Sequence, residues 1–495
     1  MLREYRTISG LIRVALGASL FLLMAGTLAD ADLWGHLRFG LDMLSTGRLT
    51  AVDPYSFTSD RPWINHEWLS ELLMAIAYRG AGATGLNGLK LACIATIVTV
   101  VVAIARQHHA TPAARDILVG LTVFATYTRT AAIRPQMFSV AVFCVVLYVL
   151  KEADRGRLRA LWILPFCFAV WVNLHGGWIL GLAVAGIWFA GAIVQQPPRR
   201  KTLLLVIAGV ATLAATLVNP YGIGLWYFLA KTVGLGRADI TEWNPLLALP
   251  PLILVFETIL PMVAVATTRQ AHWRPAWKDA AIVLLLVAAA FKVGRLDAFA
   301  QAALAILLAP GILTGLEAFG SKLHAQFWRA RVPGGDWAAV GLVALALVVG
   351  GRRLTRIVVE GAWIPDKDAA MFLREHAHGA RVLTWFDWGE YALWQLSPVG
   401  IRVSMDGRRE TVYSSDVVRG HNGFYEAHAG DLDYAERIGA DAVWLPVNAP
   451  VIAILRGRGW HIAFESTRSL VLTRAAKDSS RAATVSEERG IFPWP

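Results

Sequence analysis

The hydrophobic pattern of the chain is dominated by long apolar runs separated by short polar connections. Runs of membrane-spanning length or slightly less predict about eleven transmembrane helices before residue 351. They cover residues 9–29, 86–105, 117–128, 137–150, 160–173, 178–194, 202–218, 251–268, 279–291, 298–316 and 337–350. Beyond them the pattern changes to short strand-like runs and amphipathic helices, which indicates a second folded part.

We therefore predict a polytopic α-helical membrane protein with a small C-terminal α/β domain. Residues 1–350 form the transmembrane domain, which includes a long outer loop at residues 30–84. Residues 351–475 form the α/β domain, in which "DKDAAMFLREH" predicts a helix, and "ARVLTWF", "IRVSMD", "DAVWLP" and "SLVLT" predict strands. Residues 476–495 are polar and are expected to be disordered.

A further helix is predicted inside the long outer loop. The stretch "INHEWLSELLMAIAYRG" offers Asn65 as the residue that caps the helix start. Its apolar face comprises Trp68, Leu69, Leu72, Leu73 and Ile76. Such a helix is expected to lie along the membrane interface.

Composition and charge support a membrane protein. Hydrophobic residues make up 56% of the chain, charged residues only 17%, and the mean hydropathy is +0.49, which excludes an ordinary soluble globule. The formal net charge is +11, but the chain from residue 352 onward is neutral, so the excess belongs to the membrane part. No nucleic-acid-binding motif competes with this interpretation. The three cysteines, Cys93, Cys144 and Cys167, lie in apolar runs and indicate neither disulfides nor a zinc site.

The cationic loops predict the orientation of the chain. Basic residues recur at every second connection, which places the N-terminus in the cytoplasm, and an odd number of spans then places the C-terminal domain outside. We expect a multi-pass protein of a bacterial inner membrane with a periplasmic C-terminal domain. The first span, with the small residues of "GTLADA" at its exit, also fits a cleaved signal peptide.

Two acids stand at the outer end of the first span, in "ADADLWGHLRFG". An acid beside a bilayer is costly unless it has a function, so Asp32 is the candidate general base and Asp30 a second candidate. The alternative is that both acids simply end the helix and face water. Downstream of Asp32, the apolar side chains Trp34, Leu37 and Phe39 are expected in the headgroup zone, with Arg38 reaching a phosphate.

Four cations lie on the outer side, where the charge rule predicts few. The turns "RTAAIRPQ" and "KVGRLDAF" contain Arg129, Arg134, Lys292 and Arg295. Fixed cations in a poorly hydrated place stabilise phosphate charge strongly, so these residues are candidates to bind a lipid phosphate. Snorkelling to ordinary headgroups is the alternative. We expect the four cations to share one external cavity with Asp32.

Other polar and aromatic residues of the outer loops and the tail are further candidates. Glu67 and Glu242 are alternative acids. Acceptor or substrate contacts are predicted for His36, Arg38, His66, His175, Trp385, Asp387, Trp388 and Glu390. Helix ends, turns and the core of the small domain are equally ordinary places for these residue types.

Three of these stretches resemble the catalytic subunit of oligosaccharyltransferase, a member of the GT-C superfamily of membrane glycosyltransferases. "DADLWGHLRFGLDMLSTGRLTAVDPYSF" is similar to its first-loop motif and places Asp32 at the catalytic acid. "DITEWNP" is similar to its loop motif ending in Ser-x-Ser-Glu and places Glu242. "TWFDWGEY" is similar to its Trp-Trp-Asp-Tyr-Gly signature and places Phe386, Asp387, Trp388 and Gly389.

The resemblance implies a sugar donor linked to polyprenyl phosphate and a glycan, lipid or protein acceptor. The oligosaccharyltransferase subunit also has an acidic pair that helps to hold a divalent metal, whereas the corresponding turn here has Arg129 and Arg134 and no acid. A metal-dependent mechanism is therefore doubtful. In this respect the chain resembles the monosaccharide-transferring members, such as protein O-mannosyltransferases and lipid A aminoarabinose transferases, in which cations hold the donor phosphate.

The sequence thus predicts an inverting GT-C glycosyltransferase that acts on the cell envelope at the outer face of the membrane. A transporter or flippase of a lipid-linked or anionic solute is a rival from another class, but it would favour repeated halves and polar residues at mid-membrane. A catalytically inactive relative that only binds a glycan is a third possibility. Neither rival explains the grouping of acids and cations at one boundary as directly.

Overall fold

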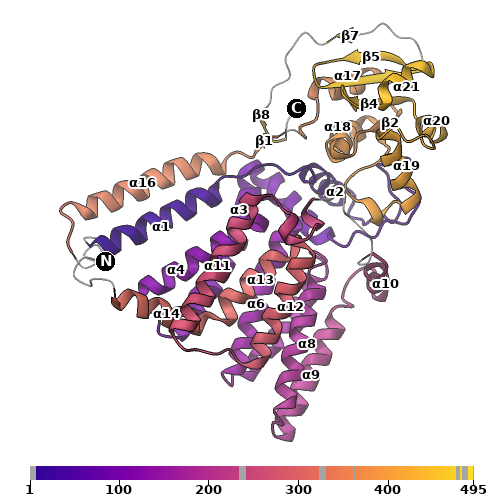
Figure 1. Cartoon of the computed structure of the whole chain (residues 1–495). Helices are drawn as coiled ribbons and strands as arrows, with labels where there is room; N and C mark the ends of the chain where they lie inside the picture. The colour runs from indigo at the N-terminus through magenta and orange to yellow at the C-terminus, as the bar shows by residue number, and fades with distance from the viewer. Residues whose placement is uncertain are drawn as a thin grey trace. The chain divides into compact units, whose positions relative to one another are not determined.

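The computed structural model describes residues 7–232, 241–322, 330–361, 363–474, 480–481 and 489–493, and the chain forms two compact units (Figure 1). Unit 1 comprises Met1–Thr27 and Ala83–Thr355. Unit 2 comprises Leu28–Gly82 and Arg356–Pro495. The long outer loop, which the sequence pattern assigned to the transmembrane domain, therefore packs with the C-terminal residues.

Unit 1 is helical throughout its described elements. Its helices are α1 (Ile8–Ala25), the second half of α3 (Trp68–Gln107), α4 (Pro112–Ala125), α5 (Tyr127–Thr130), α6 (Pro135–Asp154), α7 (Ile163–Trp171), α8 (Trp178–Val194), α9 (Arg199–Ala215), α10 (Ile223–Thr232), α11 (Pro251–Gln270), α12 (Trp277–Lys292), α13 (Asp297–Leu307), α14 (Ala309–Lys322) and α16 (Gly335–Leu354). Short 3-10 turns, among them η3 (Thr241–Trp243) and η5 (Gly294–Leu296), connect them. Each of the eleven predicted apolar segments coincides with helix, so the prediction of a polytopic helical protein is confirmed.

Fewer helices are long enough to cross a membrane than there are apolar segments. Among the described residues, five helices are long and apolar enough to cross a bilayer: α1, α3, α6, α11 and α16. A sixth crossing is reached if Gly294–Leu307 and Ala309–Gly320, which meet at 67°, count as one broken span. At 1.5 Å per residue, shorter helices such as α8 fall below the hydrocarbon thickness. Eleven transmembrane helices therefore stays a prediction.

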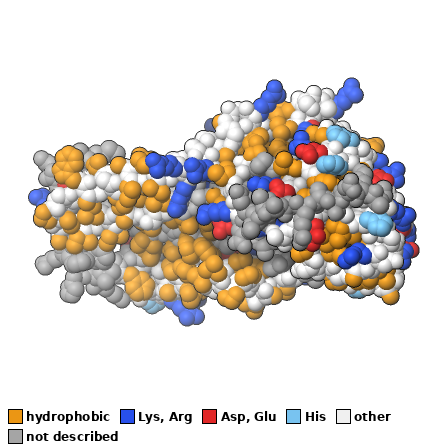
Figure 2. Space-filling view, turned by 90° about the horizontal axis from the view of Figure 1, so that it is seen from above, with side chains coloured by type: hydrophobic (Ala, Val, Ile, Leu, Met, Phe, Trp, Pro, Cys, Tyr) orange, Lys and Arg blue, Asp and Glu red, His pale blue; other side chains and the backbone are white. Residues whose placement is uncertain are grey.

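Helices α1 and α16 run side by side within unit 1 (Figure 1). Gly350 of α16 lets the ring of Phe21 approach closely, since a Cβ at this glycine would overlap it. The other face of α16 is apolar and exposed, with Trp337 at 80% and Leu347 at 60%. Figure 2 likewise shows broad areas of hydrophobic side chains on the face it presents. Large exposed apolar surfaces of this kind are suited to lipid.

Unit 2 is built on a six-stranded mixed sheet (Figure 1). The strand order is β3-β2-β4-β6-β5-β7. The strands are β2 (Arg381–Thr384), β3 (Arg402–Val403), β4 (Ala442–Pro446), β5 (His461–Glu465), β6 (Ser469–Thr473) and β7 (Ser480–Arg481). The helices of its C-terminal part are α17 (Lys367–His376), α18 (Gly389–Leu396), α19 (Ser415–Tyr425), α20 (Tyr434–Arg437) and α21 (Val451–Gly457). The predicted α/β domain is confirmed, although β5 was not foreseen.

The end of the chain is more ordered than the polar composition suggested. Strand β8 (Arg489–Ile491) pairs antiparallel with β1 (Val358–Glu360), and Phe492 is buried. The expectation of a disordered tail is therefore wrong for residues 489–493, because backbone pairing and one aromatic side chain hold them. Residues 475–479 and 482–488 lie outside the described residues.

The long outer loop joins the sheet of unit 2 at the β3 edge. Ser56 pairs parallel with Val403, the Phe57 N–H donates to the Val403 carbonyl at 3.1 Å, and the Val403 N–H donates to the Tyr55 carbonyl at 3.0 Å. This segment therefore acts as a further edge strand. It explains why the loop belongs to unit 2.

A buried arginine also holds the long outer loop, through side-chain contacts. Arg408 donates to both oxygens of Asp53 at 2.8 Å and also to Asp406, at 2.6 Å for the closest pair. All three side chains are nearly inaccessible to solvent. The guanidinium also lies 4.9 Å from the Phe39 ring centroid and 4.7 Å from that of Trp63. Bidentate pairing and ring stacking are interactions that lysine could not supply equally well.

We expect Arg408→Met to lower the free energy of unfolding by about 3–5 kcal/mol, because it leaves two buried carboxylates without their cation. Thermal unfolding of the detergent-solubilised protein measures this, together with proteolysis within residues 28–82. Arg419→Met is the matched control: Arg419 forms an exposed ion pair with Asp416, and its loss should change stability by less than about 0.5 kcal/mol. Equal effects of the two substitutions would contradict the anchoring role.

Candidate functional site

Asp32 stands directly before helix α2 (Leu33–Thr46) in unit 2. The carboxylate of Asp30 accepts a hydrogen bond from the Asp32 N–H at 3.0 Å, so Asp30 orders the turn that leads into α2. The Asp32 carbonyl in turn accepts from the His36 N–H at 3.1 Å. Asp32 is partly exposed to solvent.

The apolar residues after Asp32 do not lie in a headgroup zone. Trp34, Leu37 and Phe39 are at most 2% exposed, which corrects the sequence-based expectation. The Trp34 ring packs edge-on against Tyr391 of α18 at 5.5 Å, and its indole N–H donates to the Pro493 carbonyl at 2.6 Å. An apolar helix face suits a protein core as well as it suits lipid, and here the core of unit 2 covers it. Arg38 pairs with Asp42 one turn further along α2.

Glu390, in the first turn of α18, lies directly beneath α2. It is 5% exposed, and its Oε2 has no hydrogen-bond partner among the described residues. A Cβ added at Gly35 of α2 would overlap this carboxyl group, so only glycine fits there. The point where a Cβ of Gly407 would stand is 2.8 Å from Glu390 Oε1 and 2.8 Å from Asp32 Oδ1. Glu390 Oε1 and Asp32 Oδ1 are therefore no more than twice 2.8 Å apart.

The surroundings of Glu390 oppose its ionisation. Burial raises the pKa of Glu390, and the negative charges of Asp406, Asp32 and Glu71 raise it further, while Arg408 only partly offsets them. The resulting pKa is well above the usual range for a glutamate. Burial and the neighbouring acids thus favour the neutral form of Glu390 over its charged form. We call Asp32, Glu71, Glu390 and Asp406 the carboxylate cluster.

His36 borders the carboxylate cluster on the side of helix α3. Its Nδ1 is 3.2 Å from Glu71 Oε1, and Asn65 donates to Glu71 Oε2 at 2.6 Å. Burial alone lowers the pKa of His36, but the hydrogen bond to Glu71 and the nearby charges of Glu67 and Asp32 outweigh burial and raise it.

The outer-loop helix begins as the sequence predicted. Its first residue is Trp68, and the Asn65 side chain accepts from the Glu67 N–H at 3.2 Å. His66 lies beside Glu67, with 3.7 Å between Nε2 and Oε1. The helix continues as α3 across a break at Gly82, whose φ of 56° favours glycine. Ile76, on the predicted apolar face, is 51% exposed.

The tail candidates separate into buried and accessible residues. Trp388 is 5% exposed and donates from its indole to the Trp363 carbonyl at 3.0 Å, so it belongs to the core. Glu390 is buried as described above, and neither side chain can contact an acceptor directly. Trp385 is half-buried, with its ring 4.7 Å from that of Tyr425, and Asp387 is exposed. Only these two remain as candidates for acceptor contact.

In unit 1, three of the four predicted cations converge on one carboxylate. Glu242 Oε2 accepts from Arg134 at 3.0 Å and from Arg129 at 3.1 Å, and Arg295 lies 3.3 Å from Oε1. We call Arg129, Arg134 and Arg295 the arginine cluster. Lys292 is exposed at the end of α12.

The arginine cluster makes Glu242 a very weak base. Burial alone would raise the pKa of Glu242, but the charges of Arg295, Arg134 and Arg129 outweigh it and lower the pKa to about 2. A carboxylate of this pKa is a poor acceptor of a proton from a hydroxyl group. The arrangement therefore argues against Glu242 as the general base and gives it the role of a counter-ion.

Two further contacts fix the arginine cluster. Asp297, at the start of α13, accepts from Arg129 Nε at 2.9 Å, and its side chain is fully buried. Gln136 donates to the Arg295 carbonyl at 2.9 Å. His175, by contrast, is buried in the turn before α8, where its Nδ1 lies 2.9 Å from Ser139 Oγ and accepts from the Gly177 N–H. Its surroundings indicate a turn-stabilising role.

The residues that sequence reasoning missed are partners of those it found. Asp53, Glu71, Asp406 and Arg408 complete the surroundings of Asp32, and Asp297 completes those of Arg129. Asp297 follows Arg295 closely in "KVGRLDAF", where an acid near a cation on the unexpected side signals internal pairing. Asp53 and Arg408 are 355 positions apart, and no local pattern connects them.

Within the residues that the structure describes, no group of three or more His, Cys, Asp or Glu side chains is arranged to hold a metal ion. The doubt about a metal-dependent mechanism, which comes from the sequence, therefore stays a prediction. Each polar group can instead be described by its protein contacts.

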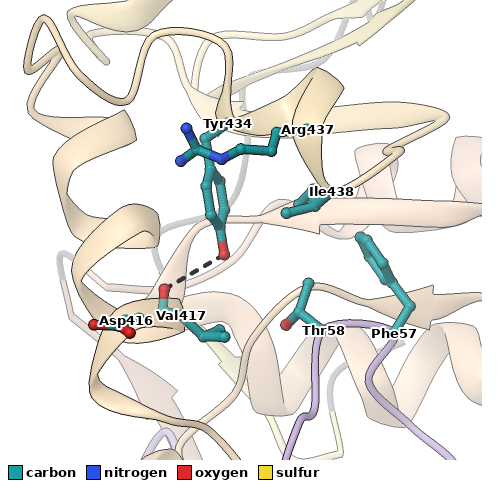
Figure 3. Close-up of a pocket in the computed structure, with 7 residues that line it drawn as sticks. All are labelled: Phe57, Thr58, Asp416, Val417, Tyr434, Arg437 and Ile438. Atoms are coloured by element: carbon teal, nitrogen blue, oxygen red, sulfur yellow. Dashed lines mark hydrogen bonds between the residues drawn. The ribbon is translucent and has the colours of Figure 1, made fainter.

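An open cavity of about 390 Å³ lies elsewhere in unit 2 (Figure 3). Its lining residues are Phe57, Thr58, Asp416, Val417, Tyr434, Arg437 and Ile438. The Tyr434 hydroxyl donates to the Val417 carbonyl at 3.4 Å, and the Arg437 guanidinium lies 5.3 Å from the Tyr434 ring centroid. None of the sequence-predicted site residues lines it.

Comparison with solved structures gives matches over nearly the whole chain. ArnT from Cupriavidus metallidurans, bound to undecaprenyl phosphate, matches with a TM-score of 0.53 at 13% identity, covering 95% of this chain and 98% of that one. Its apo state matches with a TM-score of 0.55. Arabinofuranosyltransferase AftD from Mycobacteria matches with a TM-score of 0.54 at 16% identity, covering 94% of this chain and 40% of that one. No family model matches the sequence, and no curated protein matches it significantly.

ArnT and AftD both have GT-C membrane folds. This chain has the GT-C fold. The fold implied by the three sequence motifs is thereby confirmed. The narrower resemblance to the oligosaccharyltransferase subunit rests on those motifs alone. Within the GT-C fold, the carboxylate cluster belongs to the unit formed by the first outer loop and the C-terminal domain, and the arginine cluster to the helical unit.

We expect Gly35→Ala to destabilise unit 2 by about 1–3 kcal/mol, because the new methyl group overlaps the buried Glu390 carboxyl and forces α2 and α18 apart. Thermal unfolding measures the loss. Gly457→Ala in α21 is the control, since nothing stands within 4 Å of a Cβ there. A Gly35→Ala protein as stable as this control would contradict the close packing of Glu390 against α2.

Proposed function

We propose that this protein is a membrane glycosyltransferase that moves a sugar from a polyprenyl-phosphate donor to a cell-envelope acceptor. The observation that carries the proposal is a partly exposed Asp32 held by a buried polar network at the start of the first outer loop. The GT-C fold supports it, because ArnT has this fold and was solved with undecaprenyl phosphate bound. AftD, an arabinofuranosyltransferase, has it as well.

Asp32 is the general base of the proposed reaction. It accepts the proton of an acceptor hydroxyl group while the hydroxyl oxygen forms a bond to the anomeric carbon and the bond from that carbon to the donor phosphate breaks. This single displacement inverts the configuration of the anomeric carbon. A positioned base contributes about 10²- to 10⁴-fold in rate. Asp30 orders the turn that presents Asp32, and His36 and Glu67 adjust the charge beside it.

The arginine cluster binds the phosphate that departs. Among the described residues, its guanidinium groups form ion pairs with Glu242 and Asp297, and the phosphate takes the place of the more accessible Glu242. Charge-assisted hydrogen bonds from guanidinium to phosphate oxygens are among the strongest polar contacts in proteins. Lys292, exposed at the end of α12, adds a further cation.

We place the protein in a bacterial inner membrane with its N-terminus in the cytoplasm. The cationic loops support this orientation, because they recur at every second connection along the predicted spans. The acceptor would then be a periplasmic glycan, lipid or protein. Trp385 and Asp387 are the accessible residues of the tail signature that are suited to contact it.

Asp32→Asn should reduce sugar transfer by at least about 10²-fold, because the amide cannot accept the proton, and should leave folding and lipid binding intact. Transfer from a radiolabelled undecaprenyl-phosphate sugar to envelope extract measures the rate. Asp433→Asn is the control, since Asp433 pairs with Arg437 at the surface of the same unit. Normal turnover by Asp32→Asn would remove Asp32 from the mechanism.

Substitutions in the arginine cluster should change donor binding in opposite directions. Arg134→Gln removes a guanidinium and is expected to weaken binding of undecaprenyl phosphate about tenfold, whereas Glu242→Gln removes the competing carboxylate and is expected to strengthen it. Titration of the purified protein with the lipid measures both affinities, and Arg106→Gln in the last turn of α3 is the control. Weaker binding by both variants would show that Glu242 only positions the arginines.

A further inference from the structure

Glu390 lies among charged groups from three neighbouring segments of unit 2. Asp32 faces it from the start of α2, Glu71 from the first half of α3, and Asp406 and Arg408 from the segment after β3. Three of these four groups are acids. Among the described groups that act on its pKa, the cation is Arg408.

The hydrogen-bonding capacity of Arg408 is committed to other partners. It pairs bidentately with Asp53 and forms two more hydrogen bonds to Asp406. One positive charge thus already faces two buried carboxylates before Glu390 is counted. An ionised Glu390 would be a buried charge with no counter-ion, which is among the most costly arrangements in a protein.

Geometry directs the Glu390 carboxyl group toward Asp32. Its Oε1 and the Asp32 Oδ1 approach the same point above Gly407. Gly35 lets α2 approach the Glu390 carboxyl group, and Gly389 lets α18 approach the backbone of Met405 and Asp406, since a Cβ at either glycine would overlap these atoms. Glu390 is almost inaccessible, whereas Asp32 is partly exposed. Of the two groups, only Asp32 can therefore meet a substrate.

We infer that Glu390 is a positioning residue, a neutral carboxylic acid whose O–H donates to the Asp32 carboxylate and keeps Asp32 the ionised member of the pair. The inference rests on the proposed function, in which Asp32 is the base. The raised pKa of Glu390 agrees with it. Glu390 supplies an oriented donor without adding negative charge, and a hydrogen bond to the charged form favours ionisation of Asp32.

The first test detects the proton directly and needs no enzyme activity. Infrared spectra of the full-length protein near pH 7 should contain the C=O stretching band of a buried protonated carboxyl group, and this band should be missing from Glu390→Gln. Glu375→Gln, at an exposed position of α17, is the control and should retain it. A difference spectrum of the parent and Glu390→Gln that contains no such band overturns the inference.

Thermal unfolding against pH gives a second measure of the same proton. Folding raises the pKa of Glu390, so the unfolded chain releases its proton first and the folded state loses stability as pH rises above about 4.3, the ordinary value for glutamate. Glu390→Gln removes this loss. Its Tm should exceed that of the parent by several degrees near pH 8 and by little near pH 5. A Tm difference that does not depend on pH counts against the inference.

The pH dependence of transfer distinguishes positioning from a merely structural role. Glu390→Leu removes the donor, so the pKa of Asp32 should rise and the acidic limb of kcat/KM should move to higher pH by about one unit. Glu390→Gln keeps a donor of the same shape and should restore the limb. Identical acidic limbs in the two variants would contradict positioning.

A divalent cation between the two carboxyl groups is the competing explanation. It would abolish the infrared band and make the Tm of the parent, but not of Glu390→Gln, sensitive to EDTA, and either result overturns the inference. If the protein transfers no sugar at all, the proposed function fails while the infrared and thermal tests still decide whether Glu390 holds a proton.

Discussion

The buried guanidinium of Arg408 is the interaction on which the geometry around Asp32 depends. It connects the first outer loop, through Asp53, to the segment after β3, through Asp406, and it lies against aromatic rings of the same loop. Because these groups are buried, removing one member of the pairing is strongly destabilising: a buried carboxylate without its cation costs several kcal/mol. The loop that carries Asp32 is therefore held by charge pairing and backbone hydrogen bonds together. The partly exposed Asp32 thus lies on a loop that is held by a buried ion-pair network.

In the proposed reaction, the two units provide different electrostatic surroundings. In unit 2, most of the described groups that face Glu390 are acids, and together with burial they raise the pKa of Glu390. In unit 1, the charges of the arginine cluster lower the pKa of Glu242 to about 2, so Glu242 stays ionised even in acid solution. A proton acceptor and an anion site demand opposite surroundings. The two are separated here because acids surround Glu390 in unit 2 and arginines surround Glu242 in unit 1.

The sequence predicts features that local pattern encodes, and it misses those made by distant partners. Apolar runs predicted the helices, since a run such as residues 178–194 needs no partner to be recognised, and short strand-like runs predicted strands such as β4. The same reasoning wrongly placed Trp34 in the headgroup zone, because an apolar side chain fits burial against Tyr391 as well as contact with lipid. Residues 489–491 were missed because their partner strand lies far away in the chain. Asp32 and the cations were found because charge at a membrane boundary is locally conspicuous, but Arg408 and Asp53 are paired only by the fold.

In the proposed reaction, Glu242 is the counter-ion that holds the arginine cluster together before a lipid phosphate binds. Three guanidinium groups that meet within a few ångströms repel one another by several kcal/mol for each pair if the local dielectric is about 20. A carboxylate with a pKa of about 2 removes this repulsion at every physiological pH. A lipid phosphate carries more negative charge than one carboxylate and offers more acceptor oxygens, so it can take over the arginines that Glu242 holds together. Asp297 pairs with Arg129 from the fully buried side, and this contact keeps that arginine in place during the exchange. The cluster thus needs one fixed acid and one replaceable acid, and the accessibility of Glu242 compared with the burial of Asp297 assigns the two roles.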